Sequence, residues 1–243
     1  RFEAVVATQR ALGVPVLTFW RNQVVRLAHA YERDGDGQIN LGRALAGEPE
    51  LLPVWYGHQR LQIDLMTDYI ADELGIDASK IIVAGESGGG NLAIATGMQL
   101  LRDGDVGLIS GLYALCPYLA GEWPQERFPS STENNGLFIN LWGNNARMAY
   151  GIEAFDQANP LAWPMFATVD DVAGLPTTVI SVNECDPLRD EGIEFYRLLN
   201  QAGVQALCRQ VMGTLHGSEV FSVSCPGIAT ETAMSIAHLA KGN

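Results

Sequence analysis

The chain alternates apolar runs of strand length with longer segments in which apolar residues recur at helical spacing. This alternation is typical of an α/β fold with a mostly parallel sheet, right-handed crossovers and helices on both faces of the sheet. The predicted strands are Val14–Phe19, Lys80–Gly85, Gly107–Leu115, Thr177–Val182 and Val204–Met212. The predicted helices are Arg60–Leu74, Asn91–Arg102, Arg189–Ala202 and Thr230–Lys241. Because most of the strands are almost continuously apolar, we expect both of their faces to be buried.

Two long segments interrupt the alternation, Arg21–Gln59 and Pro117–Pro176. Both are longer than a usual connection, and α/β folds place substrate-binding parts on excursions from the carboxyl ends of strands. We therefore expect one domain over residues 1–243, in which residues 117–176 contribute a cap or pocket wall. Aromatic residues in that segment are candidates for an apolar wall, although core packing explains them equally well. They are Trp123, Phe128, Phe138, Trp142 and Trp163.

The charge of the chain limits its partners. A formal net charge of −13 and a pI near 4.6 argue against nucleic acid or an anionic membrane surface, which both attract basic patches. The sequence contains no apolar run of about 18 residues, so we expect no membrane span and a cytoplasmic location. The four cysteines form no CxxC pair, which favours reduced, mostly buried thiols over a zinc ribbon or a disulfide framework.

The acidic stretch ERDGDGQIN partly resembles a calcium-binding loop. Glu32, Asp34 and Asp36 stand at the first, third and fifth ligand positions. Arg43, however, occupies the position of the bidentate glutamate, where its charge would repel the ion. We therefore expect an acidic surface turn here, and the sequence predicts no metal site.

The stretch GESGGGN lies between a predicted strand and a predicted helix. A serine at a sharp turn from strand to helix has its hydroxyl lifted off the sheet, and small residues two positions before and after it let the two backbones approach. Gly85 and Gly89 meet that need around Ser87, with Glu86 completing the elbow. The N–H of Gly88 is then placed to stabilise an oxyanion. This pattern predicts that Ser87 is a nucleophile.

Neither chance nor phosphate binding accounts for this stretch as well as a nucleophile does. The five-residue GxSxG pattern arises by chance in chains of this length, but chance does not explain its position between a strand and a helix. A phosphate-binding glycine loop would end in Lys followed by Ser or Thr, which this stretch lacks, and Glu86 would repel phosphate.

A serine nucleophile needs a histidine base and an acid, which in such folds follow in the order serine, acid, histidine. His216 follows the last predicted strand and is the natural base, whereas His238 falls inside a predicted helix. The acid is expected just after the preceding strand, where Asp186 stands. Glu184 and Asp190 are its rivals. We assign no role to the remaining histidines, His29 and His58.

The motifs GESGGGNLAIAT, NECDPLRDEGI and HGSEV resemble the hormone-sensitive-lipase-like family of α/β-hydrolase carboxylesterases, in particular its bacterial members of the brefeldin A esterase type. A further stretch, PLAWP followed by FA, belongs to the same resemblance, which covers roughly residues 80–220. The resemblance implies an α/β-hydrolase fold with a cap and a triad of Ser87, Asp186 and His216. It also implies hydrolysis of small apolar esters or lactones through an acyl-enzyme, without metal or organic cofactor.

One feature of that family is missing from this sequence. The family carries an HGGG-type motif, upstream of the first strand seen here, whose N–H groups complete the oxyanion hole, and no such motif occurs in the chain. We therefore expect that the first strands of the fold are absent from this chain. The alternative is a weak or inactive hydrolase-fold protein that binds a small ligand without turning it over.

Overall fold

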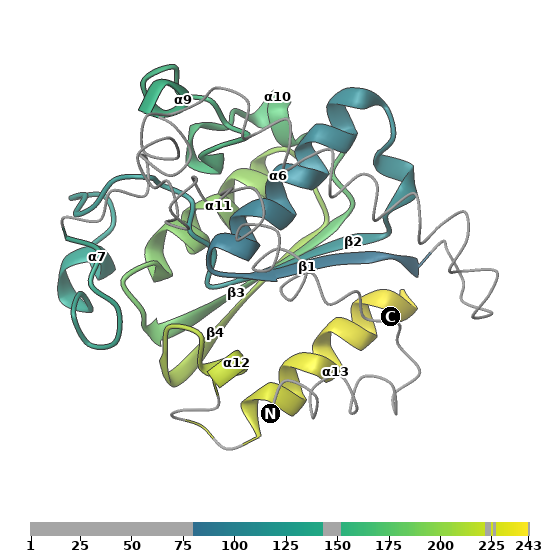
Figure 1. The fold of residues 1–243 in the computed structure, drawn as a ribbon. Coiled ribbons are helices and arrows are strands. Elements are labelled where there is room, and N and C mark those ends of the chain that lie inside the picture. Colours follow the sequence, from purple (N-terminus) through teal and green to yellow (C-terminus); the bar gives the residue numbers. More distant parts are fainter. Residues whose placement is uncertain (1–79, 143–151, 222–224, 226, 243) are drawn as a thin grey trace, which may run out of the picture.

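The structure, a computed structural model, describes residues 80–142, 152–221, 225 and 227–242. The predicted strand Val14–Phe19, the predicted helix Arg60–Leu74 and the stretch ERDGDGQIN lie outside the described residues, as do His29 and His58. The described sheet has four parallel strands in chain order (Figure 1). These strands are β1 (Ile82–Glu86), β2 (Gly111–Leu115), β3 (Thr177–Cys185) and β4 (Ala206–Leu215).

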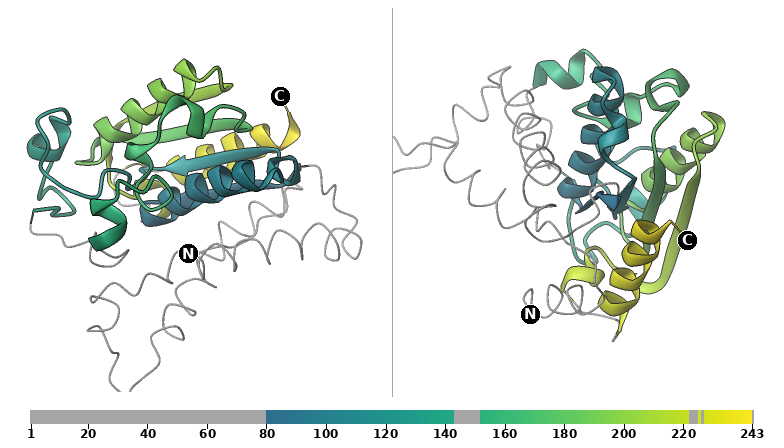
Figure 2. Two further views of the ribbon diagram at one scale, coloured as in Figure 1. Left: turned by 90° about the horizontal axis from the view of Figure 1, so that it is seen from above. Right: turned by 90° about the vertical axis from the view of Figure 1, so that its right-hand side faces the viewer.

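Helices cover both faces of this sheet, as predicted (Figures 1 and 2). On one face lie α6 (Gly88–Asp103) and α11 (Arg189–Gln201), and on the other α13 (Ile228–Lys241). Successive strand residues point to opposite faces. Leu112 and Ile180 accordingly belong to the large core beneath α6 and α11, whereas Tyr113 and Val179 pack with Leu239 of α13.

The segment between β2 and β3 carries most of the short elements. They are α7 (Ser130–Glu133), α9 (Ile152–Asp156), η4 (Pro164–Phe166) and α10 (Val169–Val172), while η3 (Val106–Leu108) precedes β2 and α12 (Ser218–Phe221) follows β4. The segment has an apolar cluster of its own. Its buried members are Ala120, Trp123, Phe128, Leu141, Ala162 and Trp163, which pack with Leu188.

The strand register brings the carboxyl ends of the strands to one edge of the sheet. Glu86 is paired with Leu115, and Leu115 with Ser181. β3 continues beyond that level, and its last residue, Cys185, is paired with Leu215 at the end of β4. The four residues that directly follow the strands therefore gather at this edge. They are Ser87, Cys116, Asp186 and His216.

Two sequence predictions about the strands are wrong in part. The first half of Gly107–Leu115 is not extended, because Val106–Leu108 forms a 3₁₀ turn and the strand begins at Gly111. The prediction that both faces are buried fails for β4, where Leu207 and Met212 are exposed, since β4 is the last strand of the described sheet.

The cysteines also differ in part from the expectation. All four are free thiols, but only Cys116 is buried, and the other three are half-buried.

A buried carboxylate ties α11 to the segment that follows β2. Glu191 accepts hydrogen bonds from the backbone N–H of Leu119 at 2.6 Å, that of Ala120 at 3.3 Å and the indole N–H of Trp123 at 2.7 Å. Burial raises the pKa of Glu191 to about 8, although the three donated hydrogen bonds act in the opposite direction. Folded protein therefore holds a proton on Glu191 at a pH where the unfolded chain releases it.

This proton predicts how stability depends on pH. Glu191→Gln is expected to lower the free energy of unfolding by about 1–3 kcal/mol near pH 5, since the amide NH₂ leaves a buried N–H without an acceptor. The unfolded carboxyl ionises above pH ~4.3, whereas the folded one does so only at about 8. As pH rises between these two values, the free energy of unfolding of the unmodified protein therefore falls. The difference in free energy of unfolding between the unmodified protein and Glu191→Gln becomes smaller over the same range.

Denaturant unfolding at pH 5, 6.5 and 8 measures this difference. Glu194→Gln, an exposed substitution on the same helix, is the matched control and is expected to change little. A constant difference between Glu191→Gln and the unmodified protein across this range would contradict the assignment.

Candidate active site

Ser87 occupies the sharp turn from β1 into α6. Its φ of 57° is in the left-handed region, which a serine adopts only when its surroundings enforce it. The turn is held by the Ser87 N–H, which donates to the Leu115 carbonyl at 2.8 Å. A Cβ at Gly85 would collide with the carbonyl oxygen of Gly89, so strand and helix need glycine here. The close approach expected of Gly85 and Gly89 is therefore present in the structure.

Gly90 is required by packing, whereas Gly88 is not. A Cβ at Gly90 would lie 3.0 Å from the Cα of Pro117, so this glycine lets α6 approach the loop after β2. At Gly88 a Cβ would meet no atom within 4 Å, so packing does not require glycine there. Gly88 is the first residue of α6, and its N–H has no carbonyl partner within the helix.

The structure brings Ser87, His216 and Asp186 together. Nε2 of His216 lies 2.9 Å from Oγ of Ser87, and Nδ1 lies 2.8 Å from Oδ2 of Asp186. Oδ1 of Asp186 accepts the backbone N–H of Leu188 at 2.9 Å. His216 and Asp186 are buried, and Ser87 is half-buried. These contacts form one continuous line of hydrogen bonds from a buried carboxylate to a partly accessible hydroxyl.

Charged neighbours raise the pKa of His216. Burial alone would lower the pKa, but the hydrogen bond to Asp186 and its charge outweigh that effect, and the charges of Glu86 and Glu219 add to it. The cationic form of the ring is therefore stabilised by three acidic side chains from β1, the loop after β3 and α12.

The rival acids have other partners. Oε2 of Glu184 accepts the N–H of Gly213 in β4 at 2.6 Å. Asp190 accepts hydrogen bonds from Arg189 at 2.8 Å and from the N–H of Ser130 at 2.7 Å. Burial alone would raise the pKa of Asp190, but these hydrogen bonds and the charge of Arg189 lower it. Of the three candidates, Asp186 is the one placed against His216.

The loop that carries Asp186 is held by the segment after β2. The amide of Asn134 donates to the carbonyls of Glu184 and Asp186 at 3.0 and 3.1 Å. The hydroxyl of Ser130 donates to the carbonyl of Pro187 at 3.0 Å. Sequence patterns give no signal for this role of Asn134, because it depends on a contact between residues about fifty positions apart.

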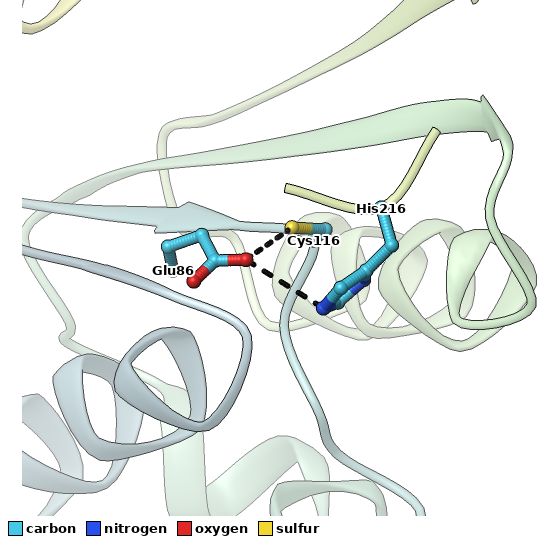
Figure 3. Close-up of side chains that lie close together, drawn as sticks. All are labelled: Glu86, Cys116 and His216. Atoms are coloured by element: carbon cyan, nitrogen blue, oxygen red, sulfur yellow. Dashed lines mark hydrogen bonds and ion pairs between the residues drawn. The ribbon is translucent and has the colours of Figure 1, made fainter. Parts of the chain in front are cut away.

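Two further buried side chains lie beside His216 (Figure 3). Oε1 of Glu86 is 3.5 Å from Nε2 of His216, and the thiol of Cys116 lies 3.5 Å from the same carboxylate oxygen. Burial raises the pKa of Glu86, although the charge of His216 acts against this. The sequence identified Glu86 only as part of the elbow and missed Cys116, since neither has a recognisable motif for contact with the histidine.

The aromatic candidates separate into two groups. Trp123, Phe128 and Trp163 are buried in the apolar cluster after β2 and serve as core of that segment. Phe138 and Trp142 are 45% and 52% exposed in the described structure. His238 lies in α13, on the sheet face opposite α6 and α11.

Comparison with known proteins identifies the family of this chain. Residues 56–220 match the sequence profile of the α/β-hydrolase fold family. The chain belongs to this family. The α/β-hydrolase fold expected from the sequence is thereby confirmed, with its parallel sheet and helices on both faces.

Solved structures of esterases resemble this α/β hydrolase closely. Esterase Est22 shares 61% sequence identity with a TM-score of 0.72, over 75% of this chain and 54% of that protein. Brefeldin A esterase, a bacterial homologue of human hormone-sensitive lipase, shares 38% identity with a TM-score of 0.70, over 80% of this chain and 54% of that protein. These similarities confirm the resemblance to hormone-sensitive-lipase-like carboxylesterases that the motifs indicated.

Curated relatives of this α/β hydrolase also include esterases. An arylesterase of Saccharolobus solfataricus is 32% identical over 151 residues, which are 60% of this chain and 46% of the relative. Carboxylesterase NlhH of Mycobacterium tuberculosis is 33% identical over 172 residues, which are 70% of this chain and 53% of that protein. The chain thus spans about half the length of these relatives. Among its described helices, none combines the length and apolar character needed to cross a membrane.

Proposed function

We propose that this α/β hydrolase cleaves carboxylic esters, with Ser87 as nucleophile, His216 as base and Asp186 as the acid that orients the base. The observation that carries the proposal is the continuous line of hydrogen bonds from Asp186 through His216 to Ser87. Its support from relatives is that several proteins similar over 60–75% of the chain are named esterases.

The geometry supports a mechanism in two stages. Neutral His216 accepts the Ser87 proton at Nε2 as Oγ attacks the ester carbonyl, and the Gly88 N–H donates to the developing oxyanion. The imidazolium then gives that proton to the departing alkoxide, which leaves an acyl-enzyme. Water, deprotonated by the same nitrogen, attacks the acyl carbon. The bond between the acyl carbon and Oγ then breaks, and the imidazolium returns its proton to Oγ of Ser87 as the acid leaves. Asp186 accepts the Nδ1–H of His216 and keeps the ring in this orientation.

We also propose that the substrate is a small apolar ester or lactone. The described part of residues 117–176 supports the role of this segment as a cap, because it has an apolar cluster of its own and its Asn134 holds the loop of Asp186. A single domain over the whole chain, a cytoplasmic location and the absence of nucleic-acid partners remain predictions from the sequence.

The alternative function is that of a hydrolase-fold protein that binds a small ligand and turns it over weakly or not at all. The fold alone does not decide between hydrolysis and binding.

The dependence of ester hydrolysis on pH separates the two functions. The base must be neutral, so kcat/KM for a short-chain p-nitrophenyl ester is expected to rise with pH through one ionisation. That ionisation should lie above the usual histidine value of about 6.5, because Asp186, Glu86 and Glu219 raise the pKa of His216. Glu86→Gln removes one of these charges and should move the ionisation to lower pH.

The control for this shift is Glu133→Gln, which alters an exposed carboxylate on α7. A rate that is flat from pH 5 to 8, or unchanged by His216→Ala, would favour the binding protein.

A further inference from the structure

Glu86, Cys116 and His216 are three side chains of metal-ligating types that lie close together (Figure 3). All three side chains are buried, and their ligand atoms lie within 4.8 Å of one another. The carboxylate oxygen of Glu86 is 3.5 Å from the sulfur of Cys116 and 3.5 Å from Nε2 of His216. We propose that this cluster binds Zn²⁺ or a similar borderline-soft divalent cation and that the bound ion blocks hydrolysis. The inhibition, though not the binding, rests on the proposed esterase function.

Two of the three separations between ligand atoms suit zinc. Zn–S distances are about 2.3 Å and Zn–N or Zn–O distances about 2.0 Å, so neighbouring ligands of a tetrahedral site lie roughly 3.3–3.5 Å apart. The two measured separations from the Glu86 oxygen, both 3.5 Å, are close to this spacing. One thiolate, one imidazole and one carboxylate favour zinc over magnesium or calcium, which prefer oxygen ligands alone.

Binding exchanges a metal ion for a proton. In the described structure the thiol of Cys116 donates to the carboxylate of Glu86. A cation between the two displaces this proton to solvent and leaves a thiolate, and with the carboxylate the two negative charges balance the 2+ charge of the ion. Glu86, Cys116 and His216 are almost inaccessible, whereas Ser87, which lies against His216, is half-buried, so we expect the ion to enter from the side of Ser87.

Inhibition follows from the atom that the ion occupies. Nε2 of His216 is also the atom that accepts a hydrogen bond from Ser87, at 2.9 Å. Coordination uses the lone pair of this nitrogen, so the ring can no longer take the serine proton. The thiol is then the feature that makes this site sensitive to zinc, although it has no part in the proposed hydrolysis.

Metal binding is measured first, without reference to activity. Co²⁺ is added to the full chain, because its thiolate complexes absorb in the near ultraviolet. The unmodified protein is expected to develop this absorption, and Cys116→Ser, which keeps the size of the side chain, is expected to lose it. Cys208→Ala removes a half-buried thiol of β4 and is expected to keep the cobalt–thiolate absorption. Cys116→Ala is the second variant if the serine variant does not fold.

Inhibition is measured second, as the rate of p-nitrophenyl ester hydrolysis against buffered free Zn²⁺, relative to the metal-free rate of each variant. Loss of even an outer-shell partner lowers metal affinity roughly 10- to 100-fold, so Cys116→Ser should raise the inhibitory concentration at least tenfold. EDTA should restore the rate of the unmodified protein. If the unmodified protein shows no cobalt–thiolate absorption, or if Cys116→Ser and Cys116→Ala keep it, the metal site is wrong. A protein that shows the absorption but hydrolyses no ester would instead contradict the proposed function.

Discussion

Ser87→Ala is expected to reduce kcat for ester hydrolysis on the order of 10⁶-fold, the loss seen when a triad loses its nucleophile. The physical reason is that the variant keeps the fold and the base but has no oxygen to form the acyl-enzyme. We expect the variant to keep the fold, because alanine is smaller than serine. The backbone hydrogen bond from the N–H of residue 87 to the Leu115 carbonyl, which holds the turn, is also retained. The rate is measured with a short-chain p-nitrophenyl ester.

Covalent labelling checks the same assignment independently of turnover. A fluorophosphonate probe is expected to modify the peptide that contains Ser87, and no other. Ser110→Ala serves as the matched control, since this serine lies just before β2, at the opposite end of the strand from the site. Labelling that persists in Ser87→Ala would place the nucleophile elsewhere in the chain.

The elements that the sequence predicted well are those with strong local patterns. Helices α6, α11 and α13 lie within a few residues of their predicted ranges, and β1 was expected directly before the serine turn. The steric need for glycine at position 85 could be predicted because the strand and the helix it separates are adjacent in the chain. Local sequence is sufficient where a feature depends on neighbours in the chain.

Features that depend on the order of strands in the sheet could not be predicted from local sequence patterns. Glu86 ends β1 and Cys116 directly follows β2, and the pairing of these two strands brings their side chains together. The exposure of β4 follows from its place at the end of the described sheet, which its apolar sequence does not indicate. Sequence reasoning favoured Asp186 over Glu184 and Asp190 by position alone, and the contacts of all three come from tertiary packing.

Asp186→Asn is expected to lower kcat roughly 10⁴-fold while leaving substrate binding largely intact, because it reverses the tautomer of His216. Oδ1 of Asp186 accepts the N–H of Leu188, so the carbonyl oxygen of an asparagine must take that position. Its NH₂ group then faces Nδ1 of His216, which must act as an acceptor. The ring proton moves to Nε2, the atom 2.9 Å from Ser87, and that nitrogen can no longer accept the serine proton.

The comparison that tests this argument uses kcat and KM for Asp186→Asn beside Glu184→Gln and Asp190→Asn, all with unfolding curves. Glu184→Gln removes a carboxylate that bonds to Gly213, and Asp190→Asn removes one that bonds to Arg189 and Ser130. Both variants are expected to change the free energy of unfolding more than kcat. Asp186→Asn should instead change kcat with little change in KM, since the residue touches the base and no substrate. An Asp186→Asn variant that keeps more than about a tenth of the rate would contradict the role of Asp186, because loss of the correct tautomer leaves the base without its lone pair.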